Sequence, residues 1–63
     1  MEVYVITIAP EACDAFVYPR AFQSMEDAKR VLREEYHDPA ERSDGVYRDS
    51  DYTYYYIDKL EVF

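Results

Sequence analysis

The sequence predicts an α+β fold in which one α-helix packs on a small antiparallel sheet, in the chain order β-β-α-β-β. Three observations lead to this prediction. A run of β-branched and aromatic residues occupies 3–8, a segment with helical periodicity occupies 22–36, and two further strand-like runs follow the helix. The 63 residues make a single domain, 1–63. So short a chain buries only about 60 % of the surface that it exposes when unfolded.

The first two strands are expected to form a hairpin. Val3–Ile8 is apolar on both faces, which is typical of a central strand, and Pro10 ends it because proline cannot donate to a sheet. A second short strand is expected at Ala15–Tyr18, before Pro19. A loop of about six residues joins the two runs, so antiparallel pairing is the simplest arrangement.

The segment Phe22–Tyr36 carries the apolar stripe of an amphipathic helix. Ser24 suits the N-cap, and an acid three residues later gives a weaker form of the capping box. The proline at position 39 keeps the residue before it out of the helical region. The helix is therefore expected to end near Tyr36 or His37, with His37 as the C-cap.

The second half of the chain is expected to contain two strands. A polar loop at 38–45 ends in an Asp-Gly turn, then a short strand at Val46–Arg48 and a tight connection at 49–51 precede the last strand, Tyr52–Phe63. In that strand Ile57 and Leu60 cannot share one face of a regular pleat. A β-bulge near Asp58 is therefore expected.

Negative charge is concentrated in residues 34–51. This stretch holds seven carboxylates against two arginines, so it contributes −5 of the net charge of −7. Its first acids, Glu34, Glu35 and Asp38, lie at the helix C-terminus, where the macrodipole makes each cost roughly 0.3 kcal/mol or more. Charges that oppose stability without structural gain favour a functional role. The alternative is a solvated face that only helps solubility.

Tyrosines lie among these acids. Tyr47, Tyr52 and the run 54–56 offer the rigid contact area that is enriched in protein interfaces, although cross-strand core packing is the alternative. Asp49 and Asp51, if the chain were extended, would stand about 6.6 Å apart. That distance is close to the spacing of neighbouring phosphates on one DNA strand.

The sequence offers no set of catalytic or metal-binding residues. Cys13 is the only cysteine, so no internal disulfide can form and a reducing cytoplasm is favoured. The single glycine, Gly45, excludes a glycine-rich phosphate loop, and the segment 49–51 lacks the Gly and Glu of a calcium loop. We therefore expect no enzyme and no cofactor. The acidic charge also argues against direct nucleic-acid binding and against anionic membranes, and the apolar run at 3–8 is too short for a signal or a membrane span.

Three features together resemble the small single-domain proteins of phages and mobile elements. They are the opening V3-Y-V-I-T-I8, the capped helix F22-Q-S-M-E-D-A-K-R30 and the acidic-aromatic half 34–56. The chain is similar in particular to acidic anti-CRISPR proteins that imitate duplex DNA, including inhibitors of type I effector complexes.

The resemblance implies a non-enzymatic inhibitor that occupies the basic PAM-reading site of a Cascade complex in the cytoplasm of a bacterial host. The implied contacts to that partner are Glu34, Glu35, Asp38, Glu41, Asp44, Asp49, Asp51, Tyr47 and Tyr52. Arg42 and Arg48 depart from a pure DNA mimic.

The alternative is a small assembly module that homodimerises through its tyrosine-rich strand. Between the two oligomeric states, the sequence favours a monomer over a dimer.

Overall fold

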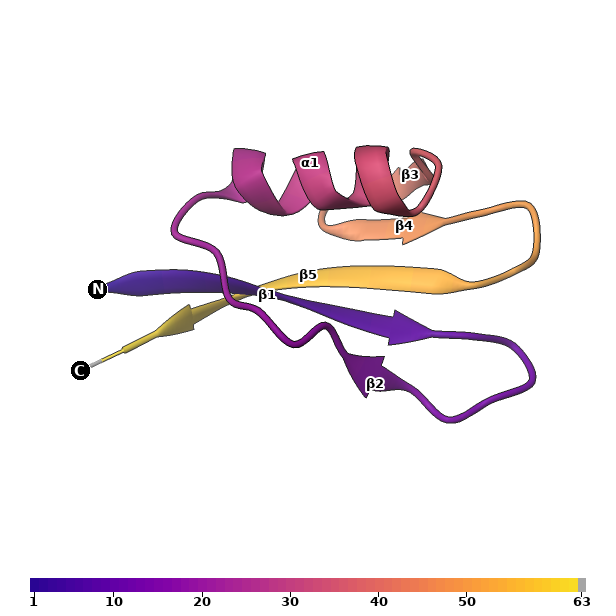
Figure 1. Cartoon of the computed structure of the whole chain (residues 1–63), viewed down its shortest axis with the longest axis horizontal. Coiled ribbons are helices and arrows are strands. Elements are labelled where there is room, and N and C mark those ends of the chain that lie inside the picture. Colours follow the sequence, from indigo (N-terminus) through magenta and orange to yellow (C-terminus); the bar gives the residue numbers. More distant parts are fainter. Residues whose placement is uncertain (63) are drawn as a thin grey trace.

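The computed structural model describes residues 1–62 and shows one helix packed on a five-stranded antiparallel sheet (Figure 1). This confirms the expected α+β class. Phe63, where the last strand was expected to end, lies outside the described residues. In chain order the elements are β1 (Glu2–Ala9), β2 (Phe16–Val17), α1 (Met25–Glu35), β3 (Ala40–Ser43), β4 (Val46–Arg48) and β5 (Tyr54–Glu61).

The expected order β-β-α-β-β is wrong, because a further strand, β3, lies between the helix and β4. The sheet has the strand order β2-β1-β5-β4-β3. β3 occupies part of the expected loop 38–45, and all four of its residues are exposed. It forms because Gly45 turns the chain back with a φ of 74°, and the Gly45 carbonyl accepts a hydrogen bond from the Ile57 N–H at 2.9 Å.

β1 and β5 form the centre of the sheet. β1 lies between β2 and β5, as expected for a strand that is apolar on both faces, and its pairing with β2 is antiparallel. β5 lies between β1 and β4, and its residues 54–56 pair with strands on both sides. The tyrosine-rich segment therefore has no free edge along which a second copy could pair.

The register of β1 and β5 is regular along the whole ladder. It runs from Glu2 opposite Glu61 to Ala9 opposite Tyr54 without interruption, so the expected bulge near Asp58 is wrong. Leu60 lies on the face away from the helix, 49 % exposed, which removes the need for a bulge. The register shift in this sheet lies instead in the β3–β4 hairpin, between residues 41 and 43.

Ser24 caps α1 as expected, because its hydroxyl accepts a hydrogen bond from the Asp27 N–H at 3.2 Å. The helix ends at Glu35, and the C-cap is Tyr36 rather than His37. His37 and Asp38 both adopt positive φ, 60° and 53°, as the chain turns toward β3. The Asp38 N–H reaches back to the Leu32 carbonyl at 3.0 Å, which gives this carbonyl a second hydrogen bond beside the one that it accepts from the Tyr36 N–H at 3.2 Å.

The helix covers only one face of the sheet. The core is formed by side chains from α1, from that face of the sheet and from Phe22. The backbone of Phe22 forms an isolated β-bridge with Tyr4 of β1. The buried residues of this hydrophobic core are Ile6, Ile8, Phe22, Ala28, Leu32, Tyr47, Tyr55 and Ile57. No helix within residues 1–62 has the length and apolar character needed to cross a membrane.

Candidate functional site

The fold divides the acidic segment 34–51 among three places. Glu34 and Glu35 lie at the end of α1, while Asp38, Glu41 and Asp44 belong to β3 and its flanking turns. The remaining acids, at 49 and 51, follow β4. The seven acids among the expected contacts therefore do not form one continuous row, and each group has its own surroundings.

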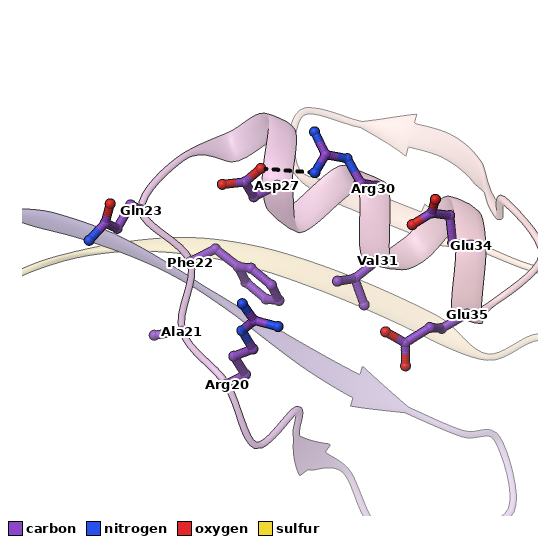
Figure 2. Close-up of a pocket in the computed structure, with 9 residues that line it drawn as sticks. All are labelled: Arg20, Ala21, Phe22, Gln23, Asp27, Arg30, Val31, Glu34 and Glu35. Atoms are coloured by element: carbon purple, nitrogen blue, oxygen red, sulfur yellow. Dashed lines mark ion pairs between the residues drawn. The ribbon is translucent and has the colours of Figure 1, made fainter.

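Glu34 and Glu35 line an open groove of 520 Å³ between α1 and the segment that leads into it (Figure 2). Arginines share this groove with the acids. The Arg30 guanidinium pairs with Asp27 at 3.5 Å, and the Arg20 guanidinium lies 5.6 Å from the centre of the Phe22 ring. The groove is therefore mixed in charge. Its lining consists of Arg20, Ala21, Phe22, Gln23, Asp27, Arg30, Val31, Glu34 and Glu35.

Glu35 holds a tyrosine in place. The Tyr18 hydroxyl donates to both carboxylate oxygens of Glu35, at 3.0 and 2.8 Å. This hydrogen bond to Glu35 raises the pKa of Tyr18, because the carboxylate stabilises the neutral phenol. The Tyr18 ring packs against Phe22 and, edge-on, against Tyr36, so Glu35 helps to tie the β2 side of the sheet to the helix end.

Asp49 organises the β4–β5 turn. Its Oδ1 accepts hydrogen bonds from the N–H groups of Asp51 at 2.9 Å and Thr53 at 3.0 Å, and its Oδ2 accepts one from the Tyr55 hydroxyl at 2.9 Å. Burial raises the pKa of Asp49, but the three hydrogen bonds outweigh it and lower that pKa. Asp49 and Asp51 are thus joined in a turn, and the expected extended, phosphate-like pair is wrong.

The two tyrosines among the expected contacts differ in accessibility. Tyr47 belongs to the core and is only 8 % exposed, so it has little surface to offer to a partner. Burial, followed by the carboxylates of Glu41 and Asp44, raises its pKa. Tyr52 is 57 % exposed, with a φ of 62°, and the Arg48 guanidinium lies 5.1 Å from the centre of its ring.

The four remaining acids surround the β3–β4 hairpin, and we call them the hairpin carboxylates. All are exposed, and within residues 1–62 none forms an ion pair; Glu41 has a side-chain neighbour, the Tyr47 hydroxyl, whose pKa it helps to raise. Because Ala40 pairs with Arg48, the segments before β3 and after β4 leave the hairpin at the same end. The hairpin carboxylates are Asp38, Glu41, Asp44 and Asp51.

A second surface was not recognised from the sequence. The sheet face opposite α1 carries the half-buried residues Val5, Tyr54 and Tyr56, and the two tyrosine rings stack with centres 6.1 Å apart. The sequence signal for this surface was the break in apolar alternation between Ile57 and Leu60 of the last strand. That break reflects a strand that is apolar on both faces and needs no bulge.

The side chains of Cys13 and His37 belong to two different loops. Cys13 is an exposed thiol in the β1–β2 loop, and His37 is exposed in the turn after α1. Within residues 1–62, no group of three or more His, Cys, Asp or Glu side chains is placed to hold a metal ion. The arrangement of the hairpin carboxylates is one that can contact cations on a partner.

No protein-family model matches the sequence, and searches of curated proteins and of solved structures find no significant match.

Proposed function

We propose that the protein is a non-enzymatic inhibitor that imitates duplex DNA. Its hairpin carboxylates would occupy the DNA-binding surface of a basic protein, and the PAM-reading site of a type I CRISPR Cascade complex is the example implied by the resemblance. One observation supports this proposal above the others. The hairpin carboxylates are exposed and form no ion pair within residues 1–62, although two arginines, Arg42 and Arg48, belong to the same hairpin.

The position of Arg48 helps to explain why these acids form no ion pair with it. Its guanidinium lies over the Tyr52 ring and is not paired with a carboxylate. Asp38 and Asp44 lie in the turns before and after β3, and Glu41 lies within β3, so the three acids are spread along the hairpin. Each can therefore meet a different lysine or arginine of the partner. Such charges accelerate association by electrostatic steering, and their effect weakens as salt is added.

The test is a competition experiment with a purified type I Cascade complex and a labelled duplex that contains a PAM. The variant Glu41→Gln/Asp44→Asn removes two hairpin carboxylates, and Glu2→Gln/Glu61→Gln is its matched control. Both change the net charge from −7 to −5, but the control residues lie opposite each other on β1 and β5. The hairpin variant should compete about 10-fold less well, which corresponds to about 1.4 kcal/mol, and the control should compete like the unmodified chain.

Equal loss of competition in both variants would show that total charge matters and the hairpin does not. Absence of any competition by the unmodified chain would remove Cascade as the target. A pull-down with other basic DNA-binding proteins, with and without duplex DNA, would then be needed to find a different one.

A further inference from the structure

We propose that the sheet face opposite α1 is the interface of a two-fold symmetric homodimer. We call this surface the open face. On β1, β4 and β5 it comprises Val3, Val5, Thr7, Val46, Tyr54 and Tyr56, together with Leu60 and two charged residues. This dimer goes beyond the proposed function, because it involves a different surface and a second copy of this chain.

The open face follows from the register. Ile6 and Ile57 are opposite each other and buried beneath α1, so their neighbours along each strand point to the other side. Val5 lies on that side opposite Asp58, and Val46 lies opposite Tyr56. Figure 1 shows α1, the only helix within residues 1–62, along one side of the sheet. The other side thus presents half-buried valines and stacked tyrosines that no helix within residues 1–62 covers.

The charge on this face differs from that of the rest of the molecule. Within β1, β4 and β5, the register places only two charged side chains on the open face, Arg48 and Asp58. They have opposite signs, so these strands present a neutral open face, whereas the whole chain carries −7. An apolar and locally neutral patch on an acidic protein is where a second acidic copy can approach with least repulsion.

The two charges are also placed to complement each other across a two-fold axis. Arg48 is opposite Tyr54 on the neighbouring strand, and Asp58 is four residues further along β5. At about 3.3 Å per residue and about 4.8 Å between strands, they lie about 14 Å apart, too far to pair within one chain. A two-fold axis that runs between the two sheets, over the Val46–Tyr56 pair, brings each Arg48 onto the Asp58 of the other copy. An isologous interface requires this kind of self-complementarity.

The size of the face predicts a weak dimer. Three strands of up to eight residues cover roughly 26 Å by 15 Å, or about 400 Å² on each copy, half of the about 800 Å² per partner that is usual for a stable interface. Dimers should therefore form at high micromolar concentrations and dissociate on dilution. Tyr54 and Tyr56 at the centre supply the aromatic contacts that dominate such small interfaces.

The test is a charge swap measured by sedimentation equilibrium over a wide range of concentrations. The unmodified chain should approach twice its mass of 7.5 kDa as concentration rises. Arg48→Asp alone and Asp58→Arg alone each place like charges against one another in the homodimer and should weaken it at least 10-fold. An equimolar mixture of these two variants should dimerise again, because the acidic open face of one complements the basic open face of the other. The double variant, Arg48→Asp/Asp58→Arg, should also recover.

The recovery separates an interface from a folding defect, because it uses the same substituted chains. A variant that had lost its fold could not regain dimerisation by mixing, and circular dichroism of each single variant checks its fold directly. A chain that stays monomeric up to its solubility limit would overturn the proposal. So would a dimer that the single substitutions leave unchanged, or one that neither the mixture nor the double variant restores.

Discussion

The Tyr55 hydroxyl donates a 2.9 Å hydrogen bond to Oδ2 of Asp49, a carboxylate that also accepts two backbone N–H groups of its own turn. The Tyr55 ring is buried and packs against Tyr36 from the helix end, with ring centres 5.1 Å apart. This one contact therefore joins the β4–β5 turn to the core. It also means that a residue expected to bind a partner contributes first to the fold.

We expect the Asp49→Ala substitution to lower the free energy of unfolding by about 2 kcal/mol, because three hydrogen bonds to a charged acceptor are lost. The melting temperature should fall by roughly 10 °C in so small a domain. Asp49→Asn should cost about half as much, because its side-chain oxygen can still accept from the N–H groups of Asp51 and Thr53. Thermal melts followed by circular dichroism measure both values.

A double-mutant cycle with Tyr55→Phe isolates the hydroxyl contact. Tyr55→Phe keeps the buried ring, so it should cost about 1 kcal/mol. The double variant Asp49→Ala/Tyr55→Phe should then be more stable than the sum of the two single effects predicts, by about the same amount. Strict additivity would mean that the two side chains do not interact in solution.

Stability should fall at acid pH in a way that depends on Asp49. Its folded-state pKa lies below the usual value of 3.8, so the folded chain keeps this carboxylate ionised when the unfolded chain has already taken up a proton. The contribution of Asp49 to the free energy of unfolding is therefore complete above pH 3.8. It is lost as pH falls through the lower folded-state pKa. Denaturant titrations from pH 6 to pH 2 should show a shallower decline for Asp49→Asn. Equal declines for both chains would contradict the prediction.

At alkaline pH the tyrosines should produce the opposite trend. The pKa values of Tyr18, Tyr36, Tyr47 and Tyr55 are all raised above 10, by the bond to Glu35 in the first and by burial in the others. The contribution of these tyrosines to the free energy of unfolding is complete below pH 10. It is lost as pH rises toward their folded-state pKa values, because the unfolded chain releases these protons first. The part of the tyrosinate absorbance that comes from these four residues should therefore appear together with loss of the fold. Full ionisation of all eight tyrosines in a chain that is still folded would refute this.

The helix could be predicted from the sequence because its signals are local. Ser24, the apolar stripe and the proline that follows act within a few residues of one another, and the C-cap was misplaced by a single residue. β1 was equally clear, since its composition alone marks a central strand. Both elements depend on propensity and periodicity that neighbouring residues already carry.

The edge of the sheet and the placement of the acids could not be predicted in this way. Ala40–Ser43 lacks β-branched and aromatic residues, and it becomes a strand only because the Gly45 turn lays it against β4. The same hairpin separates acids that are neighbours in the sequence. Asp49 turns inward to Tyr55, whereas Asp44 stays exposed at the other end of β4, and charge counting along the chain cannot distinguish the two.

The β3–β4 turn makes a further prediction about stability. Gly45 has a φ of 74°, and a Cβ added there would lie 3.0 Å from the Ile57 carbonyl oxygen. Gly45→Ala should therefore lower the free energy of unfolding by about 2 kcal/mol, through left-handed strain and the close contact together. Gly45→Asn tolerates the left-handed region better but has the same Cβ. A smaller cost for Asn would assign the effect to backbone strain, and equal costs would assign it to the contact; no cost for Ala would contradict the turn geometry.

At the end of the β1–β5 ladder, Glu2 and Glu61 are directly opposite each other, an arrangement in which like charges repel. Lys59 relieves it only in part, through an exposed ion pair with Glu2 at 3.7 Å. Glu61→Lys should therefore raise the free energy of unfolding by about 0.5 kcal/mol at low salt. Glu11→Lys, in the exposed β1–β2 loop, makes the same change in net charge without an opposing partner on a paired strand. Urea titrations at low and high salt should show a larger gain for Glu61→Lys, and only at low salt; equal gains in both variants would mean that overall charge, and not this cross-strand pair, sets the effect.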